Sequence, residues 1–218
     1  VYHENPLGFG SEALHPGNQT FLVRMAAIER KLAENRSIKA NLEEMRRYFD
    51  LPKLPERIEI YDNSHNQGTY AVGAMVVATP EGFDKKSYRT FNIKDRTITN
   101  DDFAMMKEVL KRRFDRMAPD NRPDVILLDG GLGQLHAVHE SLSRYDLSGI
   151  SIIAISKGVD RNAGKEFYHQ LGKESFALPY RSSIAFYLQT LRDEAHRFAI
   201  GTHRKRRAKS MTKSSLDD

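Results

Sequence analysis

Two short and almost wholly apolar runs constrain the fold of this chain more than any other feature: VILLDGG at 125–131 and ISIIAISKG at 150–158. Runs of this kind are typical of strands that are covered on both faces, as in a parallel sheet. Helix-like segments follow each run, at 132–145 and at 181–207. Because strands and helices alternate here, the sequence predicts an α/β layer architecture.

Three segments upstream of these runs have strand character: RIEIYD at 57–62, YAVGAMVVAT at 70–79 and KSYRTFNI at 86–93. Short turn-forming connections between them predict an antiparallel meander. A helix is predicted from Asp101 and Asp102 through Phe114, because acidic residues stabilise a helix N-terminus. Residues 158–180 indicate a loop or a short hairpin. The expected fold class is therefore α/β, with a mixed sheet of a three-stranded antiparallel meander plus parallel strands, flanked by helices.

The N-terminal part, residues 1–55, is predicted to be distinct from the sheet. Residues 1–20 indicate an irregular arm, and 21–49 carries apolar residues at the spacings of one or two amphipathic helices. Prolines at 52 and 55 then end helical structure. We expect one domain over 56–210 and a linker over 211–218. The amphipathic segment either packs on that domain or binds a partner protein.

Composition excludes several classes of site. The chain of 218 residues contains no cysteine, which excludes disulfides, zinc–thiolate sites and a thiol nucleophile. No apolar run approaches the ~18 residues that span a bilayer, and no signal peptide opens the chain. We therefore expect a cytoplasmic protein without a membrane partner. The chain begins with Val1, as a piece of a longer protein would.

Positive charge is concentrated near the C-terminus. The stretch 192–213 holds eight Lys or Arg and two acidic residues, a net charge of 8 − 2 = +6, whereas the whole chain carries +5. Such a stripe is typical of phosphate binding. Cations also stabilise a helix C-terminus, but the number of basic side chains here exceeds what capping requires, so phosphate binding is the favoured interpretation. The side chains expected to contact a nucleic-acid backbone are Arg192, Arg197, Arg204, Lys205, Arg206 and Arg207.

Two aspartates end predicted strands, Asp62 in the first antiparallel strand and Asp129 in the first parallel one. Groups at the carboxyl ends of strands face the ligand crevice of an open α/β sheet. Paired carboxylates at this position suit Mg²⁺ or Mn²⁺, which prefer oxygen ligands. Each aspartate could equally be a turn residue.

One histidine and one acidic pair are further candidates. His196 lies beside the apolar stripe of the last helix, where it could complete a metal site, move a proton or serve structure alone. Asp101 and Asp102 could add a carboxylate or cap the helix that they begin.

Several long motifs occur in a fixed order: IEIYDNSHNQGTYAVGAMVV, YRTFNI, DDFAMMKEVLKRRF, PDVILLDGGLGQL, ISKG and LQTLRDEAHRFAIGTHRKRR. Together they resemble the C-terminal half of the UvrC family, the endonuclease subunit of the UvrABC nucleotide-excision repair system. The resemblance spans about residues 20–217 and implies a ribonuclease H-like nuclease that cuts 5′ of a lesion with Mg²⁺ or Mn²⁺. It implies that Asp62, Asp129 and His196 are the catalytic, metal-binding set, with an additional carboxylate at Asp101 or Asp102.

The resemblance also implies partners: damaged double-stranded DNA and UvrB, with UvrA acting upstream. The family's 3′ nuclease, its UvrB-contacting segment and its helix-hairpin-helix pair have no counterpart in these 218 residues. Two alternatives from other classes remain open at this point. One is a nucleic-acid-binding domain of ribonuclease H-like shape without catalysis, and the other is a partner-interaction domain.

Overall fold

The structure, a computed structural model, describes residues 16–64, 71–93, 96–99, 101–158 and 166–214, with side chains described over 23–63, 71–93, 97–99, 101–158 and 166–202. The chain forms two compact units, Val1–Ser37 and Ile38–Asp218. Helix α1 (Pro16–Tyr48) begins in the first unit and ends in the second. No helix within the described ranges is long and apolar enough to cross a membrane.

One seven-stranded sheet forms the centre of the second unit, within its described residues. Its strands are β1 (Ile58–Ser64), β2 (Val72–Thr79), β3 (Gly82–Phe83), β4 (Arg89–Asn92), β5 (Val125–Asp129), β6 (Ser151–Lys157) and β7 (Glu166–His169). Their order is β3-β2-β1-β5-β6-β7, and β4 also pairs with β2. The neighbours β1, β5 and β6 are parallel, whereas the other pairs are antiparallel. The predicted mixed sheet is thus confirmed.

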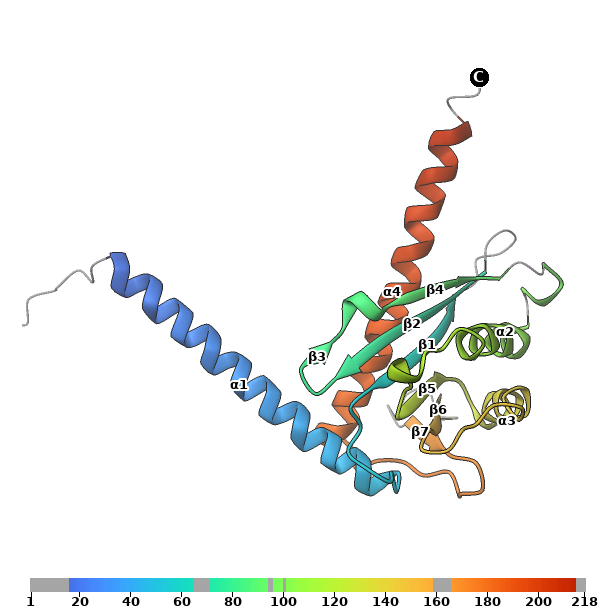
Figure 1. Cartoon of the computed structure of the whole chain (residues 1–218), viewed down its shortest axis with the longest axis horizontal. Helices are drawn as coiled ribbons and strands as arrows, with labels where there is room; N and C mark the ends of the chain where they lie inside the picture. Colours follow the sequence, from blue (N-terminus) through green and yellow to red (C-terminus); the bar gives the residue numbers. More distant parts are fainter. Residues whose placement is uncertain (1–15, 65–70, 94–95, 100, 159–165, 215–218) are drawn as a thin grey trace, which may run out of the picture. The chain divides into compact units, whose positions relative to one another are not determined.

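Helices cover both faces of this sheet. Helices α2 (Asp102–Phe114) and α3 (Leu132–Ser141) lie on one side of the strands and α4 (Ser183–Ser214) on the other (Figure 1). Side chains alternate between the two faces of a strand. On β1, Ile60 packs with α4 and the end of α1, whereas Tyr61 packs with α2 and α3. This alternation decides which polar side chains of a strand face α4.

The surface of α4 that meets the sheet follows from its sequence. Its buried residues recur at helical spacing: Ile184, Leu188, Leu191, Ala195 and Ala199. A stripe with this period buries one side of a helix and leaves the other exposed. The helix continues to Ser214, beyond position 211 where the linker was expected.

One segment of the sheet differs from the prediction, and a second matches one of its two predicted forms. Residues 86–93 are not one strand, because the 3-10 helix η1 (Lys85–Ser87) precedes β4. The segment 158–180 contains β7, which pairs antiparallel with β6, and its residues 159–165 lie outside the described part. Tyr168 exchanges backbone hydrogen bonds of 2.8 and 3.1 Å with Phe176, so the chain turns back as the short hairpin expected here.

The end of α1 belongs to the sheet unit rather than to a separate N-terminal part. Leu42, Met45 and Phe49 are buried in the cluster that covers one face of the sheet. The compact units accordingly divide between Ser37 and Ile38, whereas the sequence placed a boundary near residue 55. The helix also begins at Pro16, within the stretch expected to be irregular. Other helices of the second unit are η2 (Arg96–Ile98) and η3 (Pro119–Asn121).

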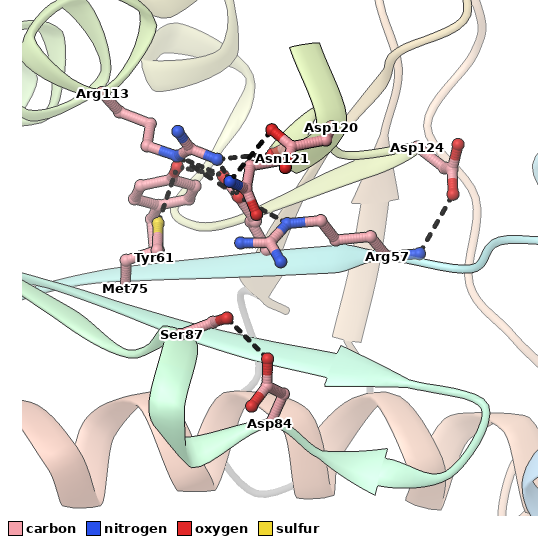
Figure 2. Close-up of polar contacts among 10 residues, drawn as sticks. Arg57, Tyr61, Met75, Asp84, Ser87, Arg113, Asp120, Asn121 and Asp124 are labelled. Carbon is pink, nitrogen blue, oxygen red and sulfur yellow. Dashed lines mark hydrogen bonds and ion pairs between the residues drawn. The ribbon is translucent and has the colours of Figure 1, made fainter. Parts of the chain in front are cut away.

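A buried ion-pair network at the start of β1 fixes α2 to the sheet. Glu59 is fully buried and accepts hydrogen bonds from Arg57 at 3.0 Å and from Arg113 of α2 at 2.7 Å. Figure 2 shows the side chains of Arg57 and Arg113 converging from opposite sides. The Tyr61 hydroxyl donates to the second carboxylate oxygen at 2.6 Å. An unpaired buried carboxylate is strongly destabilising, so these partners give the network a structural role.

Candidate active site

The two strand-end aspartates lie next to each other on the face of the sheet that α4 covers. Tyr61 of β1 is in register with Leu128 of the parallel strand β5, so the next residues, Asp62 and Asp129, occupy neighbouring positions. Both share the face of Ile60 by the alternation of side chains. The prediction that these two carboxylates meet at one end of the sheet is therefore supported by the register.

Asp62 is a buried carboxylate in an electrostatically unfavourable place. Only 7% of the residue is exposed. Burial raises the pKa of Asp62, the negative charge of Asp129 raises it further, and the hydrogen bond from His196 opposes both. Burial and a like charge each disfavour ionisation of a carboxyl group. A positive partner at this position would relieve both effects.

His196 is brought to Asp62 by α4. Its Nδ1 atom lies 3.0 Å from Oδ2 of Asp62. The imidazole side chain is 63% exposed, whereas the aspartate side chain is 9% exposed. The histidine is therefore an open group held by a buried carboxylate, rather than a core residue.

Arg192 was expected to contact a nucleic-acid backbone, but the structure places it inside the site. Its side chain is 9% exposed, and its Nη2 atom donates to Oδ1 of Asp129 at 2.6 Å. Its Nη1 atom pairs with Glu166 of β7. The sequence interpretation missed both this orientation and Glu166. One signal was available, because Arg192 and His196 are four residues apart and such residues share a helix face.

Asp101 caps the helix that it precedes. Its Oδ1 atom accepts hydrogen bonds of 3.0 Å from the backbone N–H groups of Phe103 and Ala104, as a helix N-cap does. Asn63 donates to the backbone oxygen of Asp102 at 3.2 Å, which brings the start of α2 to the end of β1. The additional carboxylate is thus near the end of the strand that carries Asp62, with one oxygen used for capping.

The remaining basic candidates lie further along α4. Arg197 is exposed and bonds Glu194 at 2.6 and 2.7 Å. Glu194 also accepts from Tyr88 at 2.9 Å, which holds this part of α4 to the segment between η1 and β4. The four other candidates for DNA contact lie on α4 with side chains outside the described residues: Arg204, Lys205, Arg206 and Arg207.

The donors at this end of the sheet suit a divalent cation in their chemistry. Asp62 and Asp129 supply two neighbouring oxygen ligands of the kind that Mg²⁺ and Mn²⁺ prefer. Among the described side chains, however, no group of three or more His, Asp, Glu or Cys residues is arranged to hold a metal ion. Asp62 bonds His196, and Asp129 bonds Arg192. The donor chemistry fits, and the joint ligand set of Asp62, Asp129 and His196 stays a prediction.

Comparison with known proteins gives consistent matches. The family described as "UvrC RNAse H endonuclease domain" matches residues 46–200. The UvrABC system protein C of Zymomonas mobilis is 54% identical over 200 residues, covering 88% of this chain and 30% of that protein. The UvrABC system protein C of Hyphomonas neptunium is 51% identical over 202 residues, covering 88% of this chain and 33% of that protein. Among solved structures, the catalytic domain of human Endonuclease V is 14% identical, with a TM-score of 0.34, covering 48% of this chain and 46% of that chain.

The chain spans about a third of the length of the curated relatives that it matches. The family match covers more than half of the chain, including the whole sheet and most of α4 up to Ile200. The mixed sheet with helices on both faces is consistent with that match. This chain therefore belongs to the family of UvrC ribonuclease H endonuclease domains.

Proposed function

We propose that this chain is a divalent-metal-dependent endodeoxyribonuclease domain that makes the incision 5′ of a lesion in nucleotide-excision repair. The observation that carries the proposal is the meeting of Asp62, Asp129 and His196 at one end of the sheet. The proposed substrate is damaged double-stranded DNA. UvrB, with UvrA acting upstream, is the proposed partner, and the cytoplasm is the proposed location.

Asp62 and Asp129 are the residues that would hold Mg²⁺ or Mn²⁺. When bound, such an ion stabilises charge on the scissile phosphate and lowers the pKa of an attacking water. The protein contributes a fixed pair of carboxylates on parallel strands, which are rigid elements of the sheet. Burial of Asp62 strengthens its attraction for a cation, because water screens that attraction less.

His196 would hold and move a proton. When Asp62 accepts a hydrogen bond from Nδ1–H, the lone pair of the neutral ring is on Nε2. The exposed position of the ring leaves Nε2 accessible to a substrate. We assign it either metal ligation through the Nε2 lone pair or, when the ring is protonated on both nitrogens, proton transfer from Nε2 to the leaving 3′-oxygen of the cleaved phosphodiester.

The basic side chains of α4 would position DNA without reading its sequence. Contacts to phosphates fix the register of a duplex and carry no direct sequence information. Arg197, Arg204, Lys205, Arg206 and Arg207 keep this proposed role. Arg192 does not, because it is buried and paired within the site.

The experiment is incision of a lesion-containing duplex labelled at the 5′ end of the damaged strand. The chain is added with UvrA, UvrB and Mn²⁺ in turn, and the length of the labelled product locates the cut. We expect a cut 5′ of the lesion that requires Mn²⁺ and is lost with a chelator. DNA binding without a cut under any of these conditions would support the non-catalytic nucleic-acid-binding alternative instead.

A further inference from the structure

The feature that the proposed reaction leaves unexplained is the buried arginine of α4. Arg192 bridges Asp129 of β5 and Glu166 of β7, two strands that are separated by β6 in the sheet. Its Nε atom is buried and has no hydrogen-bond partner among the residues that the structure describes. An arginine that served only to tie α4 to the sheet would be expected to use all of its donors, because an unsatisfied buried N–H is destabilising.

The side chains of Asp129, Glu166 and Arg192 differ in their exposure to solvent. Asp129 is 32% exposed and Glu166 is 21% exposed, whereas Arg192 is 9% exposed. The carboxylates therefore reach solvent and the guanidinium lies beneath them. A cation from solution can approach Asp129 without first displacing the arginine from a surface position.

Glu166 is held independently of the arginine. It accepts a hydrogen bond of 3.1 Å from the hydroxyl of Tyr168, which is on the same strand and is itself buried. Lys157 of β6 is the residue directly opposite Glu166 in the antiparallel pair. Glu166 is thus a fixed carboxylate that remains available to Arg192 if Asp129 turns to another partner.

We propose that Arg192 is the internal counter-ion that a divalent cation replaces at Asp129, and that Glu166 retains the arginine when the exchange occurs. In this role Arg192 and Glu166 are positioning residues. The arginine neutralises Asp129 in the metal-free protein and limits repulsion from Asp62. The inference rests on the proposed metal-binding function of Asp62 and Asp129.

The exchange makes opposite predictions for its two positioning residues. Arg192→Gln removes the competing cation, so the affinity of the chain for Mn²⁺ should rise by about tenfold, the equivalent of one charge-assisted hydrogen bond. Glu166→Gln leaves the arginine with Asp129 as its charged partner. Displacing the arginine from Asp129 would then leave its buried charge without a partner, so Mn²⁺ affinity should fall.

The double variant decides whether Glu166 acts through the arginine. In the Arg192→Gln background, Glu166→Gln should leave Mn²⁺ affinity unchanged, because the two residues form one thermodynamic unit. Affinity is measured for Mn²⁺ alone, from the loss of the electron paramagnetic resonance signal of the free ion. Arg192→Lys gives a second background that keeps the charge but lacks the planar guanidinium group that bonds two carboxylates at once. In this background Glu166→Gln should lower Mn²⁺ affinity by less than it does in the parent. The test can therefore still be made if Arg192→Gln does not fold.

Two results would overturn the exchange. One is a lowered Mn²⁺ affinity in Arg192→Gln, which would mean that the arginine merely supports the site. The other is an equal loss from Glu166→Gln in every background, which would make Glu166 a direct ligand. Asp129→Asn separates these failures from failure of the proposed function. If Asp129→Asn binds Mn²⁺ like the parent, the metal site itself is wrongly placed.

Discussion

The Nδ1 atom of His196 lies 3.0 Å from Oδ2 of Asp62, although the two residues are 134 positions apart in the sequence. The contact joins an exposed imidazole on α4 to a buried carboxylate on β1. Neither residue is needed for the apolar layers on the two faces of the sheet. Substitutions at this contact should therefore change the rate of incision more than they change the free energy of unfolding.

His196→Ala should lower the rate of incision by roughly 10²-fold or more, as expected for loss of a proton-transfer group or ligand. Its free energy of unfolding should change by less than about 1 kcal/mol, because the ring is exposed and water replaces it at Asp62. Both quantities are measured on one preparation. Asp193→Ala, an exposed change on the same helix, is the control. Near-normal turnover with a lowered melting temperature would assign the histidine to structure.

Asp101 has two possible roles that substitution can separate. Asp101→Asn keeps a side-chain oxygen for the N–H groups of Phe103 and Ala104, so stability should stay near that of the parent. Asp101→Ala should cost ~1 kcal/mol, the usual effect of losing an N-cap. If the carboxylate takes part in the reaction, both variants lose incision. Full incision by Asp101→Asn would restrict this residue to capping α2.

DNA binding should depend steeply on salt. Five cations of α4, Arg197 and those at 204–207, remain as proposed phosphate contacts after Arg192 is assigned to the site, so the slope of log affinity against log salt should be about −4.5. Neutralising the four at 204–207 should remove most of that slope. The control neutralises four exposed cations of α1, namely Arg24, Arg30, Lys31 and Arg36. An equal loss of slope in the control would show that charge alone, rather than this end of α4, binds the duplex.

His169 makes stability depend on pH. Burial lowers the pKa of His169, whose two ring nitrogens lie 2.8 Å from the Ser156 hydroxyl and 2.6 Å from the Ser175 hydroxyl. Below about pH 6.5 the unfolded chain takes up this proton more readily than the folded one. Stability from this group is therefore present above that pH and is lost as the pH falls through the lower pKa of the folded state.

Urea unfolding at pH 7.5 and pH 5.0 measures this loss. His169→Gln should show a smaller decrease in the free energy of unfolding than the parent between the two values. His136→Gln, on the exposed surface of α3, should retain the parental decrease. The same decrease in the parent and in His169→Gln would place the pH-sensitive group elsewhere.

The sequence predicted the elements whose signals are local. The apolar runs of β5 and β6, the alternation in β1 and the acidic start of α2 each depend on neighbouring residues, and all were found near the expected positions. The split of 86–93 into η1 and β4 was not predicted, because Asp84 caps η1 through a backbone contact that strand periodicity does not reveal.

Three residues of the site were predictable from local sequence, because Asp62 and Asp129 end predicted strands and His196 lies beside the apolar stripe of the last helix. The resemblance then implied that they form one set, and the structure brings Asp62 to both of the others. The inward orientation of Arg192 depends on how α4 is rotated against the sheet. Its pairing with Glu166 depends on where β7 joins the sheet edge. Both are set by contacts between segments far apart in the sequence, so composition indicated a DNA contact instead.

We propose that Asp62 is a metal-binding catalytic carboxylate. The rate at which Asp62→Asn cuts the lesion-containing duplex at saturating Mn²⁺ tests this assignment. Asparagine keeps the shape and can still accept from His196, but it lacks the charge that a divalent ion requires. We expect no detectable incision by Asp62→Asn, with the melting temperature and DNA affinity of the parent retained, and full incision by the exposed control Asp120→Asn. Incision by Asp62→Asn at more than about a tenth of the parental rate, far above the loss expected for a metal ligand, would contradict it.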